Sequence, residues 1–254
     1  MTVTLMQTEL VWEDRDANLA HFNQLMAGIL ESADLIILPE MFSTGFSMNT
    51  EALAEKENGA TIQWLQQKAG EMQSVLTGSV IIEEGGRYYN RLFWMRPDGT
   101  YDTYDKRHLF SMANEQDHFT AGHNRLVVEL NGWRICPQIC YDLRFPVWTR
   151  NRDDYDFMFF VANWPERRNF AWKSLLQARA IENQAYVVGL NRIGTDGNGV
   201  YHSGDSALID PLGEVVFTEP DNPAIRTFTL SAERLNYVRT KFPFLQDRDD
   251  FELK

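Results

Sequence analysis

The segment Ile135-Cys-Pro-Gln-Ile-Cys140-Tyr-Asp-Leu-Arg-Phe-Pro146 is the most informative stretch of the sequence. Its first half is an apolar run typical of a strand buried on both faces, and its second half is a polar turn before a helix. A cysteine that leaves a buried strand at such a turn can expose a thiolate beside backbone N–H groups. An isolated cysteine is more often a core residue, and we expect this role for Cys136. Buried strands followed by helices predict an α/β fold.

Two further segments place ionisable side chains directly after strand candidates. Glu40 follows the apolar run 35–38 in Leu38-Pro-Glu40-Met-Phe, and Lys106 lies in Tyr104-Asp-Lys106-Arg-His-Leu-Phe110. A carboxylate and an ammonium group at comparable strand ends could activate the Cys140 thiol and transfer its proton. Considered alone, Lys106 is better interpreted as an exposed lysine of the basic cluster 106–108.

Hydrophobic periodicity and turn residues predict the other elements. The predicted strands are 3–7, 35–38, 75–82, 89–95, 100–104, 126–130, 134–139, 157–162, 186–190, 206–209, 214–218 and 224–230. Helices are predicted from Asp14 or Asp16 to Leu30, over 61–71, within 145–151, from Asn169 to Ile181 and from near Ser231. Asn131-Gly132 is the strongest hairpin signal. No repeat or linker divides the pattern, so we expect one domain over residues 1–254, with sheets packed together and helices outside.

Composition excludes several classes of protein. The chain has 254 residues, of which 44% are hydrophobic, and can bury a sizeable core, so disorder is not expected. Its net charge of −12 argues against nucleic acid and anionic membranes as partners. No stretch approaches the roughly 18 apolar residues of a membrane span, and the N-terminus does not resemble a signal peptide. We therefore expect a cytoplasmic protein.

Cys136 and Cys140 are the two cysteines of the chain. If the four steps between them are extended, their Cα atoms lie about 13 Å apart, beyond the ~7 Å limit for a disulfide. We therefore expect two thiols that are not joined. Two thiols in one strand, without a companion cysteine or histidine motif, do not predict a zinc site.

The segments around Glu40, Lys106 and Cys140 resemble, in this order and spacing, the nitrilase or carbon-nitrogen hydrolase superfamily. Further similar stretches are Thr77-Gly-Ser79, Tyr89-Asn90-Arg91, Ala162-Asn163-Trp164-Pro165, 178–183 and 204–215, so the resemblance covers residues 3–230. It implies a four-layer αββα sandwich of the nitrilase type and a catalytic Glu40-Lys106-Cys140 centre. It implies no metal and no organic cofactor.

The same resemblance implies roles for these side chains. The Cys140 thiolate attacks an amide carbonyl, Glu40 relays the proton to the departing ammonia, and water then cleaves the thioester. Lys106 and the backbone N–H of Tyr141 stabilise the oxyanion. Family members often have a second glutamate after the lysine, and Glu115 in 112–119 is similar to it. It would orient Lys106 or assist the second proton transfer, and Asp117 is the rival carboxylate.

Within the superfamily the sequence is most similar to the omega-amidase branch, judging by 104–110, 140–148, 161–165, 180–186 and Lys241-Phe-Pro. This implies hydrolysis of the terminal amide of 2-oxoglutaramate or 2-oxosuccinamate to the dicarboxylate and ammonia. Arg144 could bind the substrate carboxylate. A structural role, in which Arg144 pairs with Asp142 or Asp156, is slightly favoured.

Aromatic residues near the proposed strand ends could form the wall of a small pocket. They are Phe42, Phe46, Tyr141 and Trp164, and for each of them core packing is an equal alternative. The resemblance also implies a homo-oligomer, with a dimer favoured. The tail from about residue 231, which contains Phe242-Pro-Phe-Leu245 and Phe251, could lie at the subunit contact or pack on its own subunit.

Three alternatives remain open at this point. A related enzyme could act on a nitrile, a carbamoyl amine or another linear amide with the same catalytic residues. A noncatalytic binding member is disfavoured because every proposed catalytic side chain is present. A thiol hydrolase of another fold could use His108, His118, His123 or His202 as its base, but none of these lies in a partner motif.

Overall fold

The computed structural model describes residues 1–152 and 154–253, whose strands form two sheets. The first sheet has the order β13-β1-β2-β3-β4-β5, and β1, β2 and β3 are parallel to one another. Its strands are β1 (Thr2–Gln7), β2 (Leu35–Ile37), β3 (Val75–Glu84), β4 (Arg87–Met95), β5 (Tyr101–Asp105) and β13 (Ala224–Thr229). Because parallel strands point the same way, the segments that follow them gather at one edge.

The second sheet has the order β10-β11-β9-β8-β7-β6, and β12 pairs with β11. Its strands are β6 (Val128–Leu130), β7 (Trp133–Ile139), β8 (Phe157–Ala162), β9 (Tyr186–Asn191), β10 (Ile193–Thr195), β11 (Tyr201–Ile209) and β12 (Val215–Pro220). The central strands β7, β8 and β9 are parallel and almost entirely buried, as their continuous apolar runs predict.

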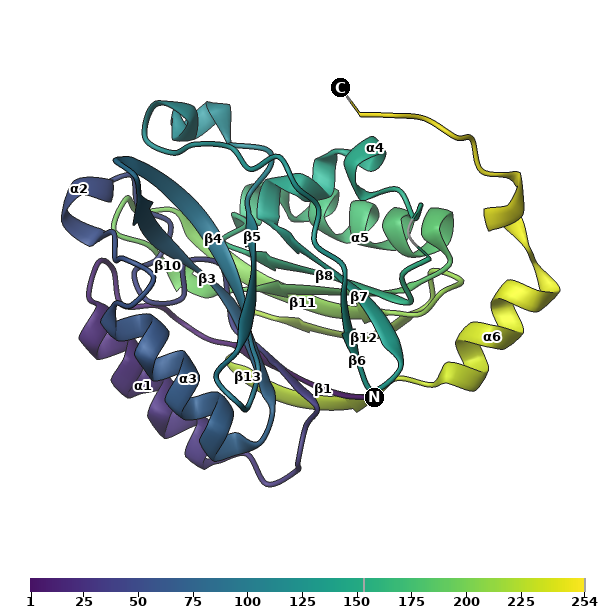
Figure 1. Ribbon diagram of the computed structural model, residues 1–254, viewed down its shortest axis with the longest axis horizontal. Helices are drawn as coiled ribbons and strands as arrows, with labels where there is room; N and C mark the ends of the chain where they lie inside the picture. Colours follow the sequence, from purple (N-terminus) through teal and green to yellow (C-terminus); the bar gives the residue numbers. More distant parts are fainter. Residues whose placement is uncertain (153, 254) are drawn as a thin grey trace.

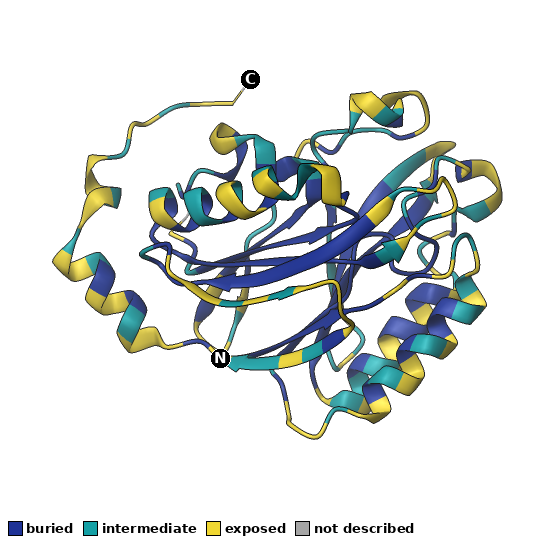
Figure 2. Cartoon of the chain, turned by 180° about the vertical axis from the view of Figure 1, so that it is seen from behind, coloured by how far each residue is buried: buried dark blue, intermediate teal, exposed yellow. Residues whose placement is uncertain are grey.

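The two sheets face each other, and helices cover their outer faces (Figure 1). Leu5 and Trp94 of the first sheet share one core with Phe159 of the second, and the rings of Trp94 and Phe159 stack at 6.4 Å. Helices α1 (Arg15–Ala27) and α3 (Ala60–Met72) pack on the first sheet, and α5 (Asn169–Asn183) packs on the second. The strands between them are buried, whereas the outer faces of the helices are exposed (Figure 2). This confirms the expected αββα arrangement.

Most predicted elements are present, with informative differences at their ends. Asp14, and not Asp16, caps α1 by accepting a hydrogen bond from the Ala17 N–H at 3.0 Å. Asn169 does not cap α5, because Arg168 occupies the N-cap position and the Asn169 side chain donates to Asp205. The short helices α2 (Thr50–Leu53) and α4 (Pro146–Thr149) are each only one turn long.

The largest difference is the pair of strands β10 and β11. The prediction contained only residues 206–209 of β11, because the preceding residues are mostly polar and give no apolar run. The structure pairs Ile193 with Ser203 and Thr195 with Tyr201, so a short hairpin extends β11 towards the N-terminal side. The polar turn 196–200 at its tip is therefore held at a defined place.

The C-terminal segment begins with α6 (Ala232–Lys241), which starts near Ser231 as predicted. Ser231 caps this helix by accepting a hydrogen bond from the Arg234 N–H. The tail continues through the 3-10 turn η5 (Phe244–Asp247) and forms an arm along one side of the molecule (Figure 1). Gln184, at the C-terminal end of α5, holds this arm, since its side chain donates to the carbonyl of Phe242 and accepts from the N–H of Leu245.

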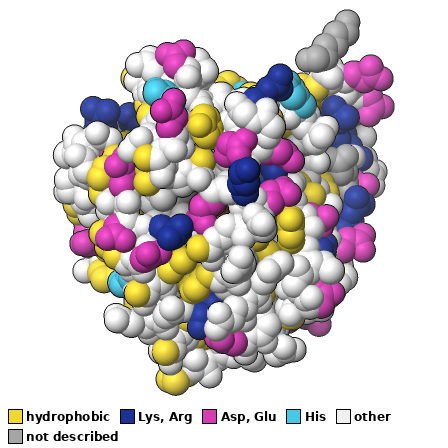
Figure 3. Space-filling model, turned by 60° about the vertical axis from the view of Figure 1, so that its left-hand side comes forward, with side chains coloured by type: hydrophobic (Ala, Val, Ile, Leu, Met, Phe, Trp, Pro, Cys, Tyr) yellow, Lys and Arg dark blue, Asp and Glu magenta, His cyan; other side chains and the backbone are white. Residues whose placement is uncertain are grey.

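The surface agrees with the acidic composition. On the face drawn in Figure 3, acidic side chains are dispersed among apolar and basic ones, without a continuous basic area. No helix in residues 1–152 and 154–253 has the length and apolarity of a transmembrane segment.

Candidate active site

Four segments that follow strands meet at one edge of the sandwich. Glu40 follows β2, Lys106 follows β5, Cys140 follows β7 and Asn163 follows β8. The two sheets are joined here, because the Asn163 N–H donates to Glu40 Oε2 at 2.9 Å. Residues from both sheets therefore form one cluster, as the sequence predicts for Glu40, Lys106 and Cys140.

Lys106 lies between two carboxylates in the interior. Its Nζ is 2.9 Å from Glu40 Oε1 and 3.0 Å from both oxygens of Glu115. All three side chains have an exposed fraction of 0%. Lys106 is therefore not the exposed residue of a basic cluster, and Glu115 is the loop carboxylate that contacts it. Asp117 is exposed and accepts a hydrogen bond from the Gln116 side chain.

The charges of this cluster are strongly coupled. Burial favours the neutral amine of Lys106, but the carboxylates of Glu115 and Glu40 outweigh burial and raise its pKa above the ordinary value. Burial raises the pKa of Glu115, and Lys106 partly offsets this effect. The cluster thus holds a permanent cation beside the nucleophile, and its two carboxylates depend on that cation.

Cys140 occupies a strained position at the end of its strand. Its φ is +42°, a left-handed conformation that side chains rarely adopt, and it begins the 3-10 turn η3 (Cys140–Arg144). Its exposed fraction is 9%. Burial raises the thiol pKa well above its ordinary value, the charge of Glu40 adds to this, and Lys106 opposes it. The raised pKa favours the thiol over the thiolate, so attack by Cys140 is aided by a neighbouring base.

Two asparagines complete the surroundings of Glu40. Asn90 on β4 donates to Oε1 at 2.9 Å, and Asn163 donates its side-chain amide to the Glu40 carbonyl at 2.6 Å. Both asparagines lie in stretches that resemble the superfamily, but the sequence did not predict a role for either. The available signal was a polar amide within or directly after an apolar strand. These donors fix the side chain and the backbone of Glu40 beside Lys106.

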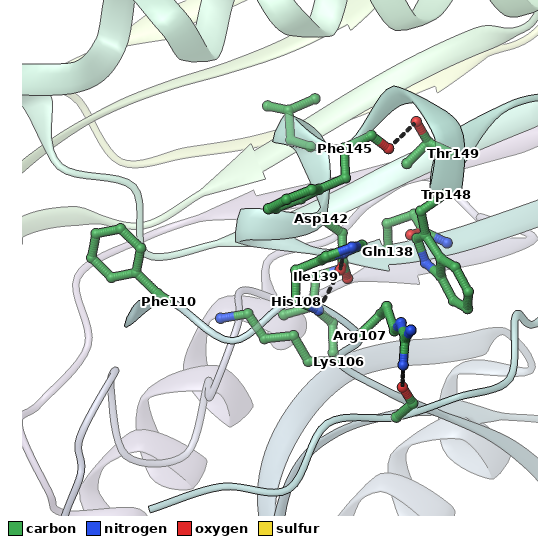
Figure 4. Close-up of polar contacts among 12 residues, drawn as sticks. Lys106, Arg107, His108, Phe110, Gln138, Ile139, Asp142, Phe145, Trp148 and Thr149 are labelled. Carbon is green, nitrogen blue, oxygen red and sulfur yellow. Dashed lines mark hydrogen bonds and ion pairs between the residues drawn. The ribbon is translucent and has the colours of Figure 1, made fainter. Parts of the chain in front are cut away.

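A third carboxylate, Asp142, connects the lysine segment to the cysteine segment (Figure 4). One of its oxygens accepts from the backbone N–H of His108 at 3.0 Å and from His108 Nδ1 at 2.8 Å. The other accepts from Tyr104 Oη at 2.7 Å and from the Ile139 N–H at 3.2 Å. The His108 ring stacks on Phe145 at 3.6 Å. Asp142 therefore fixes the two segments that present Lys106 and Cys140.

A cavity of about 160 Å³ opens above Cys140 and Lys106. Of the predicted wall residues, Phe46, Tyr141 and Trp164 line it, and so does Arg144, the candidate ligand of the substrate carboxylate. The prediction for Phe42 is wrong: it is fully buried between α1 and α3, where its ring packs on Phe22 and Trp64, and it is not among the lining residues. Its backbone lies beside the catalytic segment, but the side chain points into the core.

The favoured structural role of Arg144 is also not observed. Asp142 is occupied by Tyr104, His108 and Ile139, and Asp156 pairs with Arg239. The Arg144 guanidinium instead lies over the Trp164 ring at 4.9 Å, on the cavity wall. The sequence could not decide this, because it depends on how η3 meets the turn after β8.

The cavity wall also contains residues that the sequence analysis did not assign. Arg167, Arg168, Asp196 and His202 line it, together with Met112 at its mouth. His202 was considered as a catalytic base, but burial and the charge of Arg192 lower its pKa to about 4. No group of three or more metal-ligating side chains occurs in the described part of the chain.

Comparisons with known proteins agree with this geometry. A family model described as carbon-nitrogen hydrolase matches residues 2–239. The chain is 47% identical over 254 residues to omega-amidase YafV of Escherichia coli (strain K12), covering 100% of this chain and 98% of that protein. It is 30% identical over 251 residues to 2-oxoglutaramate amidase of Bacillus subtilis (strain 168), covering 97% and 96%. The crystal structure of XC1258 from Xanthomonas campestris, a CN-hydrolase superfamily protein with an arsenic adduct in its active site, has a TM-score of 0.97 at 44% identity and covers 100% of this chain and 99% of that one.

Proposed function

The chain belongs to the carbon-nitrogen hydrolase family, and we propose that it is an omega-amidase that releases ammonia from the terminal amide of small 2-oxo acids. The proposed substrates are 2-oxoglutaramate and 2-oxosuccinamate, and the products are the dicarboxylates. The observation that carries this proposal is the cavity in which Cys140 and Lys106 lie below a wall containing arginine side chains. The names of the two relatives support the same substrate class.

In the proposed first half-reaction, Cys140 is the nucleophile and Glu40 is the general base. As Sγ attacks the amide carbon, the thiol proton passes to Glu40, and Lys106 and the Tyr141 N–H stabilise the oxyanion. Collapse of the tetrahedral intermediate breaks the C–N bond, and the proton from Glu40 leaves with ammonia. An acyl thioester on Cys140 remains. The raised pKa of Cys140 supports attack that is coupled to proton transfer to Glu40.

The second half-reaction consumes one water molecule. Glu40 accepts a proton from the water as its oxygen attacks the thioester, and the C–S bond then breaks. The acid product leaves, and the proton returns to Cys140. Glu115 is proposed to hold Lys106 in place during both steps, since both of its oxygens lie 3.0 Å from Nζ.

The charge of the cavity supports an anionic amide. Arg144, Arg167 and Arg168 line it, and among the described lining residues Asp196 alone is acidic. The Asp196 carboxylate is already engaged by the N–H groups of Asn198 and Val200. A cationic substituent beside the arginines would be repelled by about 4 kcal/mol per contact at 4 Å and an effective dielectric of 20. Glutamine, whose α-ammonium is such a substituent, is therefore expected to be a poor substrate.

The experiment is a comparison of ammonia release by the purified protein. 2-Oxoglutaramate, 2-oxosuccinamate, glutamine, a nitrile and a carbamoyl amine are offered separately, and kcat/KM is measured for each. We expect both keto-amides to exceed glutamine by at least about 10²-fold. Equal or greater efficiency on glutamine would contradict the omega-amidase assignment, whereas faster turnover of the nitrile or carbamoyl amine would favour that alternative.

The nucleophile is tested independently of the substrate's identity. Intact mass spectrometry during turnover, followed by peptide mapping, is expected to place the acyl group on Cys140. A Cys140→Ala variant is expected to fold and to release no ammonia. Activity of that variant, or an acyl group at another residue, would contradict the mechanism.

We further propose a cytoplasmic homodimer. Neither cysteine forms a disulfide, which supports a reducing compartment. Phe170 and Ile181 on α5 and Val147 on α4 are exposed apolar residues, and a subunit contact would cover them. The tail after residue 231 is proposed to lie beside this contact within the same domain. Light scattering is expected to give twice the chain mass, and a single species of 29.4 kDa at micromolar concentrations would reject the dimer.

A further inference from the structure

Two of the cavity's arginines lie over aromatic rings without an acidic partner among the described residues. The Arg144 guanidinium lies over Trp164 at 4.9 Å, and that of Arg168 lies over Phe110 at 4.8 Å. Neither forms an ion pair with a carboxylate of residues 1–152 or 154–253. Stacking orients the plane of a guanidinium and leaves its N–H donors at the edge available for another group.

Arg168 is the more constrained of the unassigned arginines. It is half-buried, whereas its neighbour Arg167 is exposed. Burial lowers the pKa of Arg168, and the positive charges of Arg167 and Arg144 add to this effect, while Cys140 acts in the opposite direction. A desolvated cation among other cations is costly, and an anion that binds there removes this cost.

Phe110, whose ring lies under the Arg168 guanidinium, is connected to the catalytic cluster. The backbone N–H of Phe110 donates to Glu115 Oε2 at 2.5 Å, and Glu115 contacts Lys106. On the other side, the Trp164 indole donates to the Arg168 carbonyl at 2.9 Å. The Arg168 guanidinium thus contacts Phe110, whose backbone is bonded to the catalytic cluster, and the Arg168 backbone is bonded to Trp164 of the cavity wall.

We propose that Arg168 is a specificity-determining residue that binds the carboxylate of the amide substrate together with Arg144, and that Phe110 holds its guanidinium in place. This inference rests on the proposed function, because it names how the same cavity recognises an anionic amide. It adds a residue outside the proposed catalytic set, and it assigns to Phe110 a positioning role. A planar carboxylate matches the paired donors of a guanidinium, which a single ammonium group does not reproduce.

The inference can be tested without any substrate, by alkylation of Cys140. Iodoacetate carries a carboxylate, and iodoacetamide is its neutral amide. The ratio of their rates of reaction with Cys140 therefore reports the electrostatic potential beside the thiol. Any change in thiol acidity affects both reagents equally and cancels in the ratio. Rates are followed by intact mass, and peptide mapping assigns the adduct to Cys140. The matched control is Arg226→Gln, because Arg226 is an exposed arginine on β13 that does not line the cavity.

In Arg168→Gln we expect the iodoacetate-to-iodoacetamide ratio to fall about 10-fold or more, while Arg226→Gln leaves it unchanged. Phe110→Leu is a second variant, which keeps the charge but removes the aromatic platform, and it should lower the ratio by a smaller factor. An unchanged ratio in Arg168→Gln, or an equal decrease in the control, would overturn the inference.

Kinetics provide the second readout. For 2-oxoglutaramate, Arg168→Gln is expected to raise KM about 10-fold or more with a smaller change in kcat, whereas turnover of neutral pentanamide should not fall in parallel. A parallel loss on both amides would show a structural role and overturn the assignment. If the unmodified protein does not hydrolyse 2-oxoglutaramate, the proposed function fails, and the alkylation ratio still decides the role of Arg168.

Discussion

Replacing Lys106 by methionine is expected to destabilise the protein strongly, in addition to abolishing turnover. Methionine keeps much of the side-chain volume but removes the cation that lies 2.9 Å from Glu40 and 3.0 Å from Glu115. Removing one partner of a buried ion pair costs about 3–5 kcal/mol, because the other charge stays buried without compensation. For a chain of this length, about 2 °C of melting temperature corresponds to 1 kcal/mol, so the expected decrease is about 6–10 °C.

The reasoning is tested by adding Glu115→Gln. In the double variant one of the two uncompensated carboxylates is removed, and the remaining Glu40 keeps its donors from Asn90 and Asn163. The double variant should therefore be more stable than Lys106→Met alone, with a coupling of about 1–3 kcal/mol. The free energies of unfolding are measured by urea titration with tryptophan fluorescence.

A matched control is Lys68→Met, which removes a lysine from the surface ion pair with Glu71 on α3. Surface pairs of this kind contribute at most about 1 kcal/mol, so this variant should unfold close to the unmodified protein. If Lys106→Met unfolds at the same urea concentration as the control, or if the double variant is no more stable than the single one, the cluster does not depend on its cation.

Four further changes test other parts of the site. Glu40→Gln should fold and lose about 10²-fold or more in kcat, measured by ammonia release, because the base is removed. Cys136→Ala should keep turnover within a few-fold, and a loss like that of Cys140→Ala would require another nucleophile. Asp142→Asn should lower both kcat and the free energy of unfolding, the latter by about 1–3 kcal/mol, since an amide cannot accept all the bonds of the carboxylate. The pKa of His202 is lowered from 6.5 to about 4, so the folded protein favours the neutral imidazole. The free energy of unfolding should therefore decrease by about 3 kcal/mol as the pH falls from 6.5 to 4. Urea titrations at these two pH values should show a smaller decrease for His202→Gln, and an equal decrease would contradict the neutral state of His202.

The sequence predicted those features that depend on local pattern and strand order. Glu40, Lys106 and Cys140 each follow a strand, and the sheets bring them together as expected. The choice of Glu115 over Asp117 also agrees with the structure, since Glu115 alone is buried against Lys106. A charged residue directly after a buried apolar strand thus allows a site at the carboxyl end of that strand to be predicted from sequence.

What could not be predicted depends on how separate segments meet. Phe42 follows the same strand as Glu40, yet its ring packs against Gly78 in the core between the first sheet and its helices. No local sequence pattern indicates that its side chain points there and not into the cavity. Arg167 and Arg168 are adjacent and chemically identical, and they are distinguished by the burial of Arg168 and its contact with the Phe110 ring. Asn163 connects to Glu40 from the opposite sheet, a distance of 123 residues along the chain.

The division between strand ends and turns has a consequence for how this protein can change over evolutionary time. Its reactive groups lie on buried strand ends, where a substitution is severe, whereas the cavity rim comes from the turns 110–113, 165–168 and 196–200. Exposed turn positions usually tolerate replacement within about 0.5 kcal/mol. Descendants can therefore acquire new amide substrates by altering three short turns while inheriting the hydrolytic centre unchanged. A mutant library confined to these turns samples the same route in the laboratory.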